Sequence, residues 1–204
     1  EWNSLNKLST DASTVGSLDL KIINDKKNIF NDLKKNSFEI IYLLGQDNLE
    51  FNKKNEFVIY QGSHGDKGAE IADIILPGAT YTEQNGYFTN LEGKIQKAFK
   101  ASYPPGEAKE DWQIINELAE IMNNRKLFND KGELESSMFN FINLQKDNKT
   151  HLNEKTPTKE NFNNEKLIVN YRDYYFSNVI ARASKTMLDC HNSKIKIEKT
   201  GTNG

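Results

Sequence analysis

Two runs of β-branched and aromatic residues, each followed by a glycine, constrain the fold of this chain most strongly. Residues 37–44 have the sequence SFEIIYLL before Gly45, and residues 56–60 have the sequence EFVIY shortly before Gly62. Apolar runs of this length are typical of strands that are buried on both faces of a parallel sheet. They predict two neighbouring strands near the start of the chain.

A third strand is predicted over residues 73–76. It ends at Pro77, because proline has no N–H to donate to a sheet ladder. Strands separated by helical stretches favour an α/β fold with a parallel sheet. Ile75 is predicted to lie in its core, so Ile75→Asp is expected to cost several kcal/mol by burying an unpaired charge.

Apolar residues at helical spacing predict two helices near the N-terminus. Trp2, Leu5 and Leu8 recur at every third position and predict a short helix that Gly16 ends or follows. A second helix is predicted over residues 26–35.

The clearest helical pattern follows the Pro-Pro-Gly turn at residues 104–106, and a last helix is predicted from about Ser177, a residue type that favours the N-cap position. The apolar face of the first of these helices is predicted to consist of Trp112, Ile115, Leu118, Ala119 and Met122. Between the third strand and this helix, Gly86 and Gly93 bracket a hairpin-like excursion, in which glycine can adopt positive φ.

Composition divides the chain into three parts. Residues 1–122 are predicted to form an α/β domain fragment, and residues 171–204 a C-terminal strand and helix segment with a frayed tail. Residues 123–170 are polar and are predicted to form a solvated loop or insertion. The hydrophobic share of 36% agrees with polar segments around a modest core.

Charge and hydropathy exclude two kinds of partner. The net charge of -2 gives no basic field to hold a phosphate backbone, so nucleic acid is not expected to bind. A run of about 18 apolar residues, which a membrane-spanning helix needs, does not occur. We therefore expect no direct membrane span.

The segment after the second strand carries the first candidate site. Gly62, Gly65 and Gly68 lie between a strand and a helical stretch, where a glycine loop can cradle a phosphate, but their spacing matches neither common phosphate-binding motif. A surface turn is the better interpretation. His64 and Asp66 in the same segment suggest a general base, but a structural or interface histidine is favoured because no nucleophile accompanies them.

The remaining polar candidates are weaker. Glu83 and Glu92 would suit paired-acid chemistry if they met across the hairpin, but satisfied polar side chains are the default. Cys190 is the only cysteine, and it is predicted to be a small apolar residue on the last helix. The histidines, His64, His151 and His191, have no metal-binding spacing. No catalytic, cofactor-binding or metal-binding residue is therefore assigned.

Three long phrases make the chain resemble a known family. They are YQGSHGDKGAEIADIILPGATYTE at residues 60–83, TNLEGKIQ at 89–96 and PPGEAKEDWQIINELAEI at 104–121. Together with flanking segments near both ends, they resemble the C-terminal region of the large iron–sulfur subunit of mitochondrial respiratory complex I. ADIILPGATYTE with the following Asn90, Glu92, Gly93 and Gln96 also resembles the wider molybdopterin oxidoreductase family. Residues 123–170 have no counterpart in this resemblance.

The resemblance implies a parallel-sheet, Rossmann-like fragment of a molybdopterin-oxidoreductase-like domain, with a polar insertion and a C-terminal helix. It also implies a noncatalytic scaffold in the matrix arm of NADH:ubiquinone oxidoreductase, peripheral on the matrix side of the mitochondrial inner membrane. Iron–sulfur clusters and FMN are expected in neighbouring domains or subunits, and no cofactor in this chain. The expected partners are other matrix-arm subunits, including the N-terminal iron–sulfur part of the same subunit and the flavoprotein subunits.

Two other functions stay open at this point. The chain could be the C-terminal part of a molybdopterin-dependent oxidoreductase, or a free soluble α/β binding domain. The phrase PPGEAKEDW and the segment IARAS at residues 180–184 favour complex I over the first, and a start inside a helical pattern is expected to speak against the second.

Overall fold

The computed structural model describes residues 14–22, 29–46, 49, 51–147 and 173–199. The helix predicted around Trp2 therefore lies outside the described residues. Gly16 lies inside α1 (Thr14–Asp19) and does not end this helix. A Cβ on Gly16 would come within 2.8 Å of the Thr89 hydroxyl oxygen, so the glycine allows α1 to approach the hairpin strand β4 (Gly86–Thr89) closely.

The predicted parallel sheet is confirmed. It consists of β1 (Ile40–Leu44), β2 (Phe57–Gly62) and β3 (Ile74–Pro77) in the order β1-β2-β3, with both pairs of strands parallel. Pro77 is the last residue of β3, where its missing N–H disturbs no further pairing. The short helix α3 (Lys67–Glu70) connects β2 to β3, whereas the described part of the connection from β1 to β2 contains no helix.

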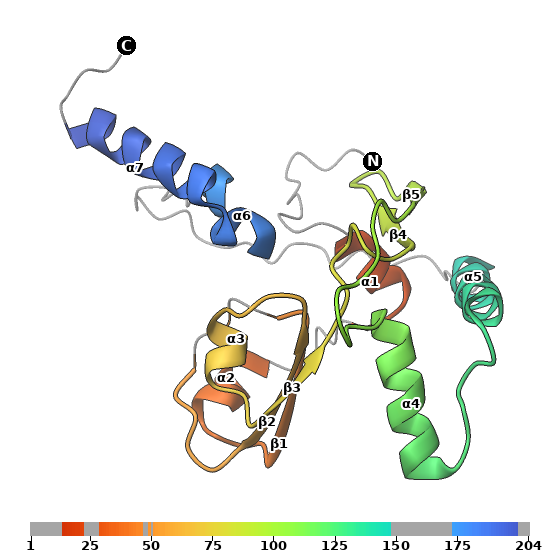
Figure 1. Ribbon diagram of the computed structural model, residues 1–204. Helices are drawn as coiled ribbons and strands as arrows, with labels where there is room; N and C mark the ends of the chain where they lie inside the picture. The colour runs from red at the N-terminus through yellow and green to blue at the C-terminus, as the bar shows by residue number, and fades with distance from the viewer. Residues whose placement is uncertain (1–13, 23–28, 47–48, 50, 148–172, 200–204) are drawn as a thin grey trace, which may run out of the picture.

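One face of this sheet is covered. Its buried cluster contains Leu33 from α2 (Ile29–Lys34), Ile41 and Leu43 from β1, and Val58 and Tyr60 from β2. Partly buried apolar side chains from residues 49–51 and 69–72 pack against this cluster. In Figure 1, α2 and α3 lie on the same side of the strands. The core of this unit is therefore one-sided.

Ile75 is not in the core, which corrects the prediction for it. Its side chain is 54% exposed. Ile75 aligns with Tyr60 on the covered face, but it lies on an edge strand, where its side chain stays more than half exposed. The predicted cost of Ile75→Asp therefore does not apply to this chain by itself.

The predicted hairpin is confirmed. β4 pairs in antiparallel fashion with β5 (Ile95–Ala98), and Gly93 in the turn has a φ of +82°. Gly86 does not have positive φ in this structure. Asn90 stabilises the turn, because its side-chain oxygen accepts hydrogen bonds from the backbone N–H groups of Glu92 and Lys94 at 3.0 and 2.9 Å.

The predicted helix after residues 104–106 is α4 (Asp111–Asn123), but its buried face differs from the prediction. Ala119 is buried, whereas Leu118 and Met122 are exposed. Asn116 is also buried, and its side chain bonds the backbone of Leu127 and Phe128 at 2.8 to 3.0 Å. The face turned inward thus holds the α4–α5 connection through a polar side chain.

Part of the segment predicted as a polar loop is a helix. α5 (Lys131–Asp147) follows α4, and residues 148–170 lie outside the described part. Ile142 is buried, and the ring of Phe139 packs edge-to-face against Tyr87 with centroids 5.1 Å apart. Figure 1 shows α4 and α5 joined by a long connection on the side of the molecule away from α7.

The described part of the C-terminal segment contains a 3-10 turn at Tyr174–Phe176 and two α-helices where one helix was predicted. α6 (Val179–Ala183) begins after Asn178, whose side chain accepts a hydrogen bond from the Ala181 N–H at 2.9 Å, so the N-cap is Asn178 and not Ser177. Ser184 has extended backbone angles and ends α6. Its hydroxyl oxygen then accepts a 3.4 Å bond from the N–H of Met187 in α7 (Lys185–Lys199).

Candidate functional site

Gly62 and Gly68 make room for Tyr60. A Cβ on Gly62 would clash with the Tyr60 hydroxyl, and one on Gly68 would lie 2.9 Å from the ring and 2.7 Å from the Gln46 carbonyl oxygen. The Tyr60 hydroxyl donates to the His64 carbonyl at 2.9 Å, which closes the loop around the ring. The glycine pattern therefore has a packing cause, and phosphate binding is not needed to explain it.

The N-terminus of α3 is occupied by a carboxylate of the chain itself. Asp66 accepts the Lys67 N–H at 2.8 Å, and its other oxygen pairs with Arg182 of α6 at 2.8 Å. Burial raises the pKa of Asp66, but the hydrogen bonds from Arg182 and the Lys67 N–H outweigh burial and leave the pKa below its usual value. A phosphate would have to displace this ion pair.

We expect Gly68→Ala to destabilise the chain by about 1–3 kcal/mol, because the added methyl group overpacks the Tyr60 site and approaches a backbone oxygen that cannot rotate away. Pulse proteolysis across a urea series measures the change. Gly65→Ala is the matched control, since a Cβ there has nothing within 4 Å. Equal midpoints for the two variants would contradict the packing explanation.

We expect acid to release the C-terminal segment from the loop. The Asp66 pKa is lowered in the fold, so the ion pair stabilises docking above the ordinary aspartate pKa of about 3.9, and this stabilisation is lost as the pH falls through the lower folded value. Arg182→Ala should remove about 1–2 kcal/mol of docking free energy at neutral pH and abolish the acid transition. Anisotropy of a fluorophore on exposed Cys190 measures docking. An acid transition that persists in Arg182→Ala would contradict this assignment.

The other sequence candidates are held locally and are not brought together. His64 Nδ1 lies 2.9 Å from the Ser63 hydroxyl oxygen, while Asp66 pairs with Arg182, so the suggested His64–Asp66 pair is not formed. Glu83 accepts a hydrogen bond from the Thr80 N–H at 3.0 Å, and Glu92 lies in the hairpin turn beside Asn90. These contacts are structural.

The histidines and the cysteine, which are the usual metal ligands, are not brought together either. His191 pairs with Asp173 and packs against the ring of Phe176, whereas His151 lies outside the described residues. Cys190 is on α7, as predicted, but it is exposed and does not serve as a small core residue. In the part of the chain that the structure describes, His, Cys, Asp and Glu side chains form no group of three that could hold a metal ion.

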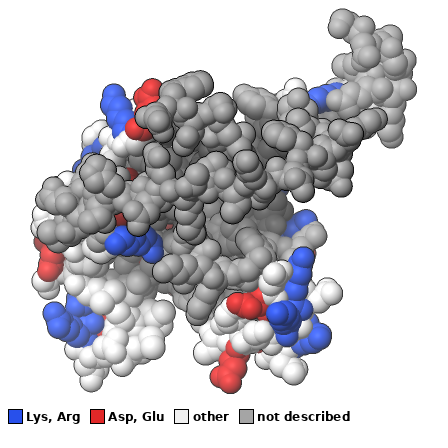
Figure 2. Space-filling view, turned by 180° about the vertical axis from the view of Figure 1, so that it is seen from behind, with Lys and Arg blue, Asp and Glu red and all other residues white. Residues whose placement is uncertain are grey.

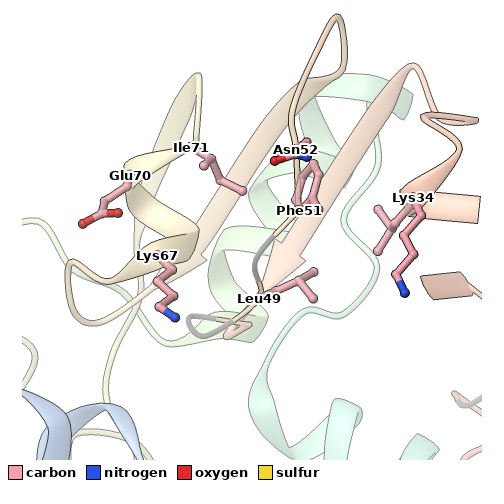
Figure 3. Close-up of a pocket in the computed structure, with 8 residues that line it drawn as sticks. Lys34, Leu49, Phe51, Asn52, Lys67, Glu70 and Ile71 are labelled. Atoms are coloured by element: carbon pink, nitrogen blue, oxygen red, sulfur yellow. The ribbon is translucent and has the colours of Figure 1, made fainter. Parts of the chain in front are cut away.

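A groove of about 520 Å³ lies beside the covered face, between α2 and α3. Figure 3 shows Lys34 and Lys67 on opposite sides of it, with Leu49 and Phe51 between them. Glu70 also lines the groove, so its rim carries both signs of charge. Figure 2 likewise shows basic and acidic side chains interspersed over the coloured part of the rear surface. Neither feature selects an anionic ligand.

Apolar side chains are also exposed on the second face of the parallel sheet, which we call the open face. The strand registers place seven apolar side chains there: Ile40, Tyr42, Leu44, Phe57, Ile59, Ile74 and Leu76. Ile40 is 64% exposed and Ile74 is 44% exposed. A parallel sheet is normally covered on both faces, so this surface has the character of a core from which one layer is missing.

A polar network ties the end of the open face to α4. Gln61 is fully buried; its side-chain amide donates to the Asp111 carboxylate at 2.8 Å, and its oxygen accepts the Tyr42 hydroxyl. Gln84 donates to the other Asp111 oxygen at 3.1 Å. Burial, with a contribution from the Asp111 charge, raises the pKa of Tyr42 and keeps its hydroxyl a donor. The sheet and α4 therefore hold each other in register.

Two protein-family models match the sequence of this chain. The model of the molybdopterin oxidoreductase family matches residues 1–121, which include the whole parallel sheet and nearly all of α4. This chain belongs to the molybdopterin oxidoreductase family. A second model describes the C-terminal region of an NADH-ubiquinone oxidoreductase subunit, and it matches residues 133–190 of this family member.

Relatives of this molybdopterin oxidoreductase family member are respiratory complex I subunits. It is 38% identical over 93% of its length to the NADH-ubiquinone oxidoreductase 75 kDa subunit of Reclinomonas americana. It is 36% identical over its whole length to the mitochondrial 78 kDa subunit of Candida albicans, and 40% identical over 95% to an NADH-quinone oxidoreductase subunit of Rickettsia conorii. The chain spans only 28% to 30% of the length of these relatives.

These matches correct one further prediction. Residues 123–170 were expected to have no counterpart in the family, but the second model covers residues 133–190, and the Candida albicans relative aligns with the whole chain. The segment is therefore part of what this chain shares with its relatives. None of the described helices is both long and apolar enough to cross a lipid bilayer.

Sequence reasoning missed three features of this site. The open face was missed because continuous apolar runs predict strands covered on both faces, and they do not show that the described residues cover only one of them. The Gln61–Asp111 bond joins residues 50 positions apart and leaves no local pattern. The Asp66–Arg182 pair spans 116 positions, although an arginine in an otherwise apolar helical turn was a usable signal.

Proposed function

We propose that this chain is a noncatalytic scaffold part of the large iron–sulfur subunit of complex I, supporting electron transfer from NADH to ubiquinone. One observation carries the proposal: the molybdopterin-type region is followed in the same chain by the C-terminal region typical of an NADH-ubiquinone oxidoreductase subunit. The open face supports a scaffold role, because such a surface is stable when another layer covers it.

The positions of the polar candidates support a chain without catalytic residues. His64, Glu83 and Glu92 are engaged in local hydrogen bonds, and Cys190 lies alone on α7. On this proposal the chain itself holds no metal, pterin or other cofactor, and the iron–sulfur clusters and FMN are bound by neighbouring domains or subunits. The sheet is then the remaining part of a Rossmann-like layer whose other strands belong to the preceding part of the subunit.

The partners and location follow from the same proposal. The open face contacts the N-terminal iron–sulfur part of the same subunit, and other surfaces contact matrix-arm subunits, including the flavoprotein subunits. The protein then lies on the matrix side of the mitochondrial inner membrane, attached through its partners. The name of the Candida albicans relative, which includes the word mitochondrial, supports this location.

Substitution of the polar candidates in the full-length subunit tests the noncatalytic role. His64→Ala, Glu92→Gln and Cys190→Ser are expected to leave NADH:ubiquinone turnover per assembled complex unchanged. The assay is performed on purified complex, with the amount of this chain quantified in each preparation. A large loss of turnover in a variant that assembles normally would contradict the proposal.

A molybdopterin-dependent oxidoreductase is the second candidate, because the family model over residues 1–121 is shared with such enzymes. Elemental analysis of the purified full-length protein separates the two functions. One molybdenum per chain would favour the second candidate, whereas iron without molybdenum would favour the complex I subunit.

A further inference from the structure

The chain segment that follows β5 presents two aromatic side chains to solvent. Phe99 is 74% exposed and Tyr103 is 76% exposed. By contrast, Tyr87 on the neighbouring strand packs its ring against Phe139 and donates its hydroxyl to Glu135 at 2.8 Å. Exposed aromatic side chains of this size are enriched where proteins bind one another.

The backbone of this segment is fixed. Lys100 N–H donates to the Asn85 side-chain oxygen at 2.9 Å, and the Ala101 and Ser102 N–H groups donate to the Thr82 carbonyl at 2.7 and 3.1 Å. A partner that binds here therefore loses little free energy in ordering the backbone, which favours tight association. Nothing in the described fold requires Phe99 and Tyr103 to point outward, because these hydrogen bonds involve only the backbone of their neighbours.

Two lysines flank the aromatic rings. The Lys100 amine lies 4.4 Å from the centroid of the Tyr103 ring, and the Lys97 amine lies 5.8 Å from that of Phe99. Lys97 also pairs with Glu135 at 3.2 Å, whereas Lys100 has no carboxylate within ion-pair distance among the residues that the structure describes. The segment is therefore an aromatic surface with one charge-paired lysine, Lys97, and one lysine, Lys100, that no described carboxylate pairs with.

We propose that Lys97, Phe99, Lys100 and Tyr103, which we call the lysine–aromatic surface, dock a second subunit of the complex through an apolar pocket rimmed by carboxylates. The inference rests on the proposed function. The open face has the apolar character of a divided core and is assigned to the preceding part of the same subunit. The lysine–aromatic surface instead presents aromatic anchors, which are enriched at contacts between protein chains, beside a lysine that can pair with a carboxylate of the partner.

Photo-crosslinking in the intact complex tests where this surface lies. Benzoylphenylalanine replaces Phe99 in the full-length subunit, the complex is purified and irradiated, and the joined peptides are identified by mass spectrometry. We expect a crosslink to another subunit, at a peptide that contains Asp or Glu. A crosslink to the preceding part of the same subunit, to lipid or to nucleic acid, or no crosslink, would overturn the inference.

Charge reversal tests the chemistry of the contact. Lys100→Glu is expected to speed dissociation of that second subunit by about tenfold or more and to lower the salt concentration at which it dissociates, as for loss of a desolvated charge contact. Lys100→Arg should retain wild-type dissociation. Lys126→Glu on the α4–α5 connection makes the same change in net charge at another exposed position and should have no effect. Equal dissociation for Lys100→Glu and Lys126→Glu would overturn the proposed acidic rim.

The outcomes separate this inference from the function on which it rests. If the chain is absent from purified NADH:ubiquinone oxidoreductase, both the proposed function and the docking surface are wrong. If the chain is present and Phe99 does not reach another subunit, only the docking surface is wrong.

Discussion

Val58→Asp is expected to abolish the fold of the parallel sheet. Val58 is fully buried at the centre of the covered face, where its side chain packs in the cluster with Leu43 and Tyr60. An aspartate there would bury a charge without a partner, a change that costs about 4–5 kcal/mol or more and so removes much of a typical domain's 5–15 kcal/mol. Pulse proteolysis of the chain and its yield in the full-length subunit measure the effect.

The matched control for Val58→Asp lies one residue earlier on the same strand. Phe57 projects from the opposite face of β2 and is partly exposed, so Phe57→Asp introduces the same charge without entering the covered core. Protease resistance of the chain alone should be lost in Val58→Asp and retained in Phe57→Asp. Equal loss in both variants would show that the two faces of the sheet are equally important in the isolated chain.

Ile40→Asp is expected to have opposite effects in two settings. In the isolated chain it places a charge on an exposed apolar surface, so it should reduce self-association through the open face. In the full-length subunit the same charge would be buried against the covering layer, and assembly should fall to a small fraction of wild type. Sedimentation measures the first effect, and native gel quantification of the complex measures the second.

Ile121→Asp provides the comparison for Ile40→Asp. Ile121 is also a highly exposed isoleucine, but it lies on α4, away from the sheet. Its substitution should leave self-association through the open face unchanged. If Ile40→Asp assembled as well as the wild-type subunit, the open face would not be an internal interface.

The strands and their parallel pairing could be predicted because the signal is local. The apolar runs that end at Gly45 and near Gly62 are short, bounded and rich in β-branched residues, and β1 and β2 fall within one to three residues of the predicted limits. The hairpin was predictable for the same reason, since a glycine such as Gly93 within a short polar segment indicates a turn. Which face of the sheet is covered depends on tertiary packing and could not be predicted from these runs.

α5 was missed because its polar composition concealed a helical spacing. Leu134, Met138 and Ile142 recur at intervals of four, and Asp130 accepts a hydrogen bond from the Glu133 N–H at 2.9 Å at the start of the helix. These residues were a usable signal. The break between α6 and α7 had a signal too, because Ser184 is a favourable N-cap residue within an otherwise continuous helical pattern.

The candidate site was harder to predict than the fold. The glycines of residues 62–68 resemble a ligand loop in sequence, and only the position of the Tyr60 side chain shows that Gly62 and Gly68 provide space for it. Asp66 and Arg182 could be recognised as charged residues, but their pairing depends on how the C-terminal segment returns to the sheet. Long-range contacts of this kind have no fixed sequence spacing.

The scaffold role is tested most directly by measuring the amount of complex and the turnover of each assembled complex in the same preparation of Ile74→Ala. Ile74 lies on the open face, and truncation of an isoleucine that is buried on assembly costs about 2–5 kcal/mol, enough to lower assembly while leaving measurable complex. We predict less assembled complex with unchanged NADH:ubiquinone turnover per complex. A normal amount of complex with reduced turnover per complex would contradict the scaffold role.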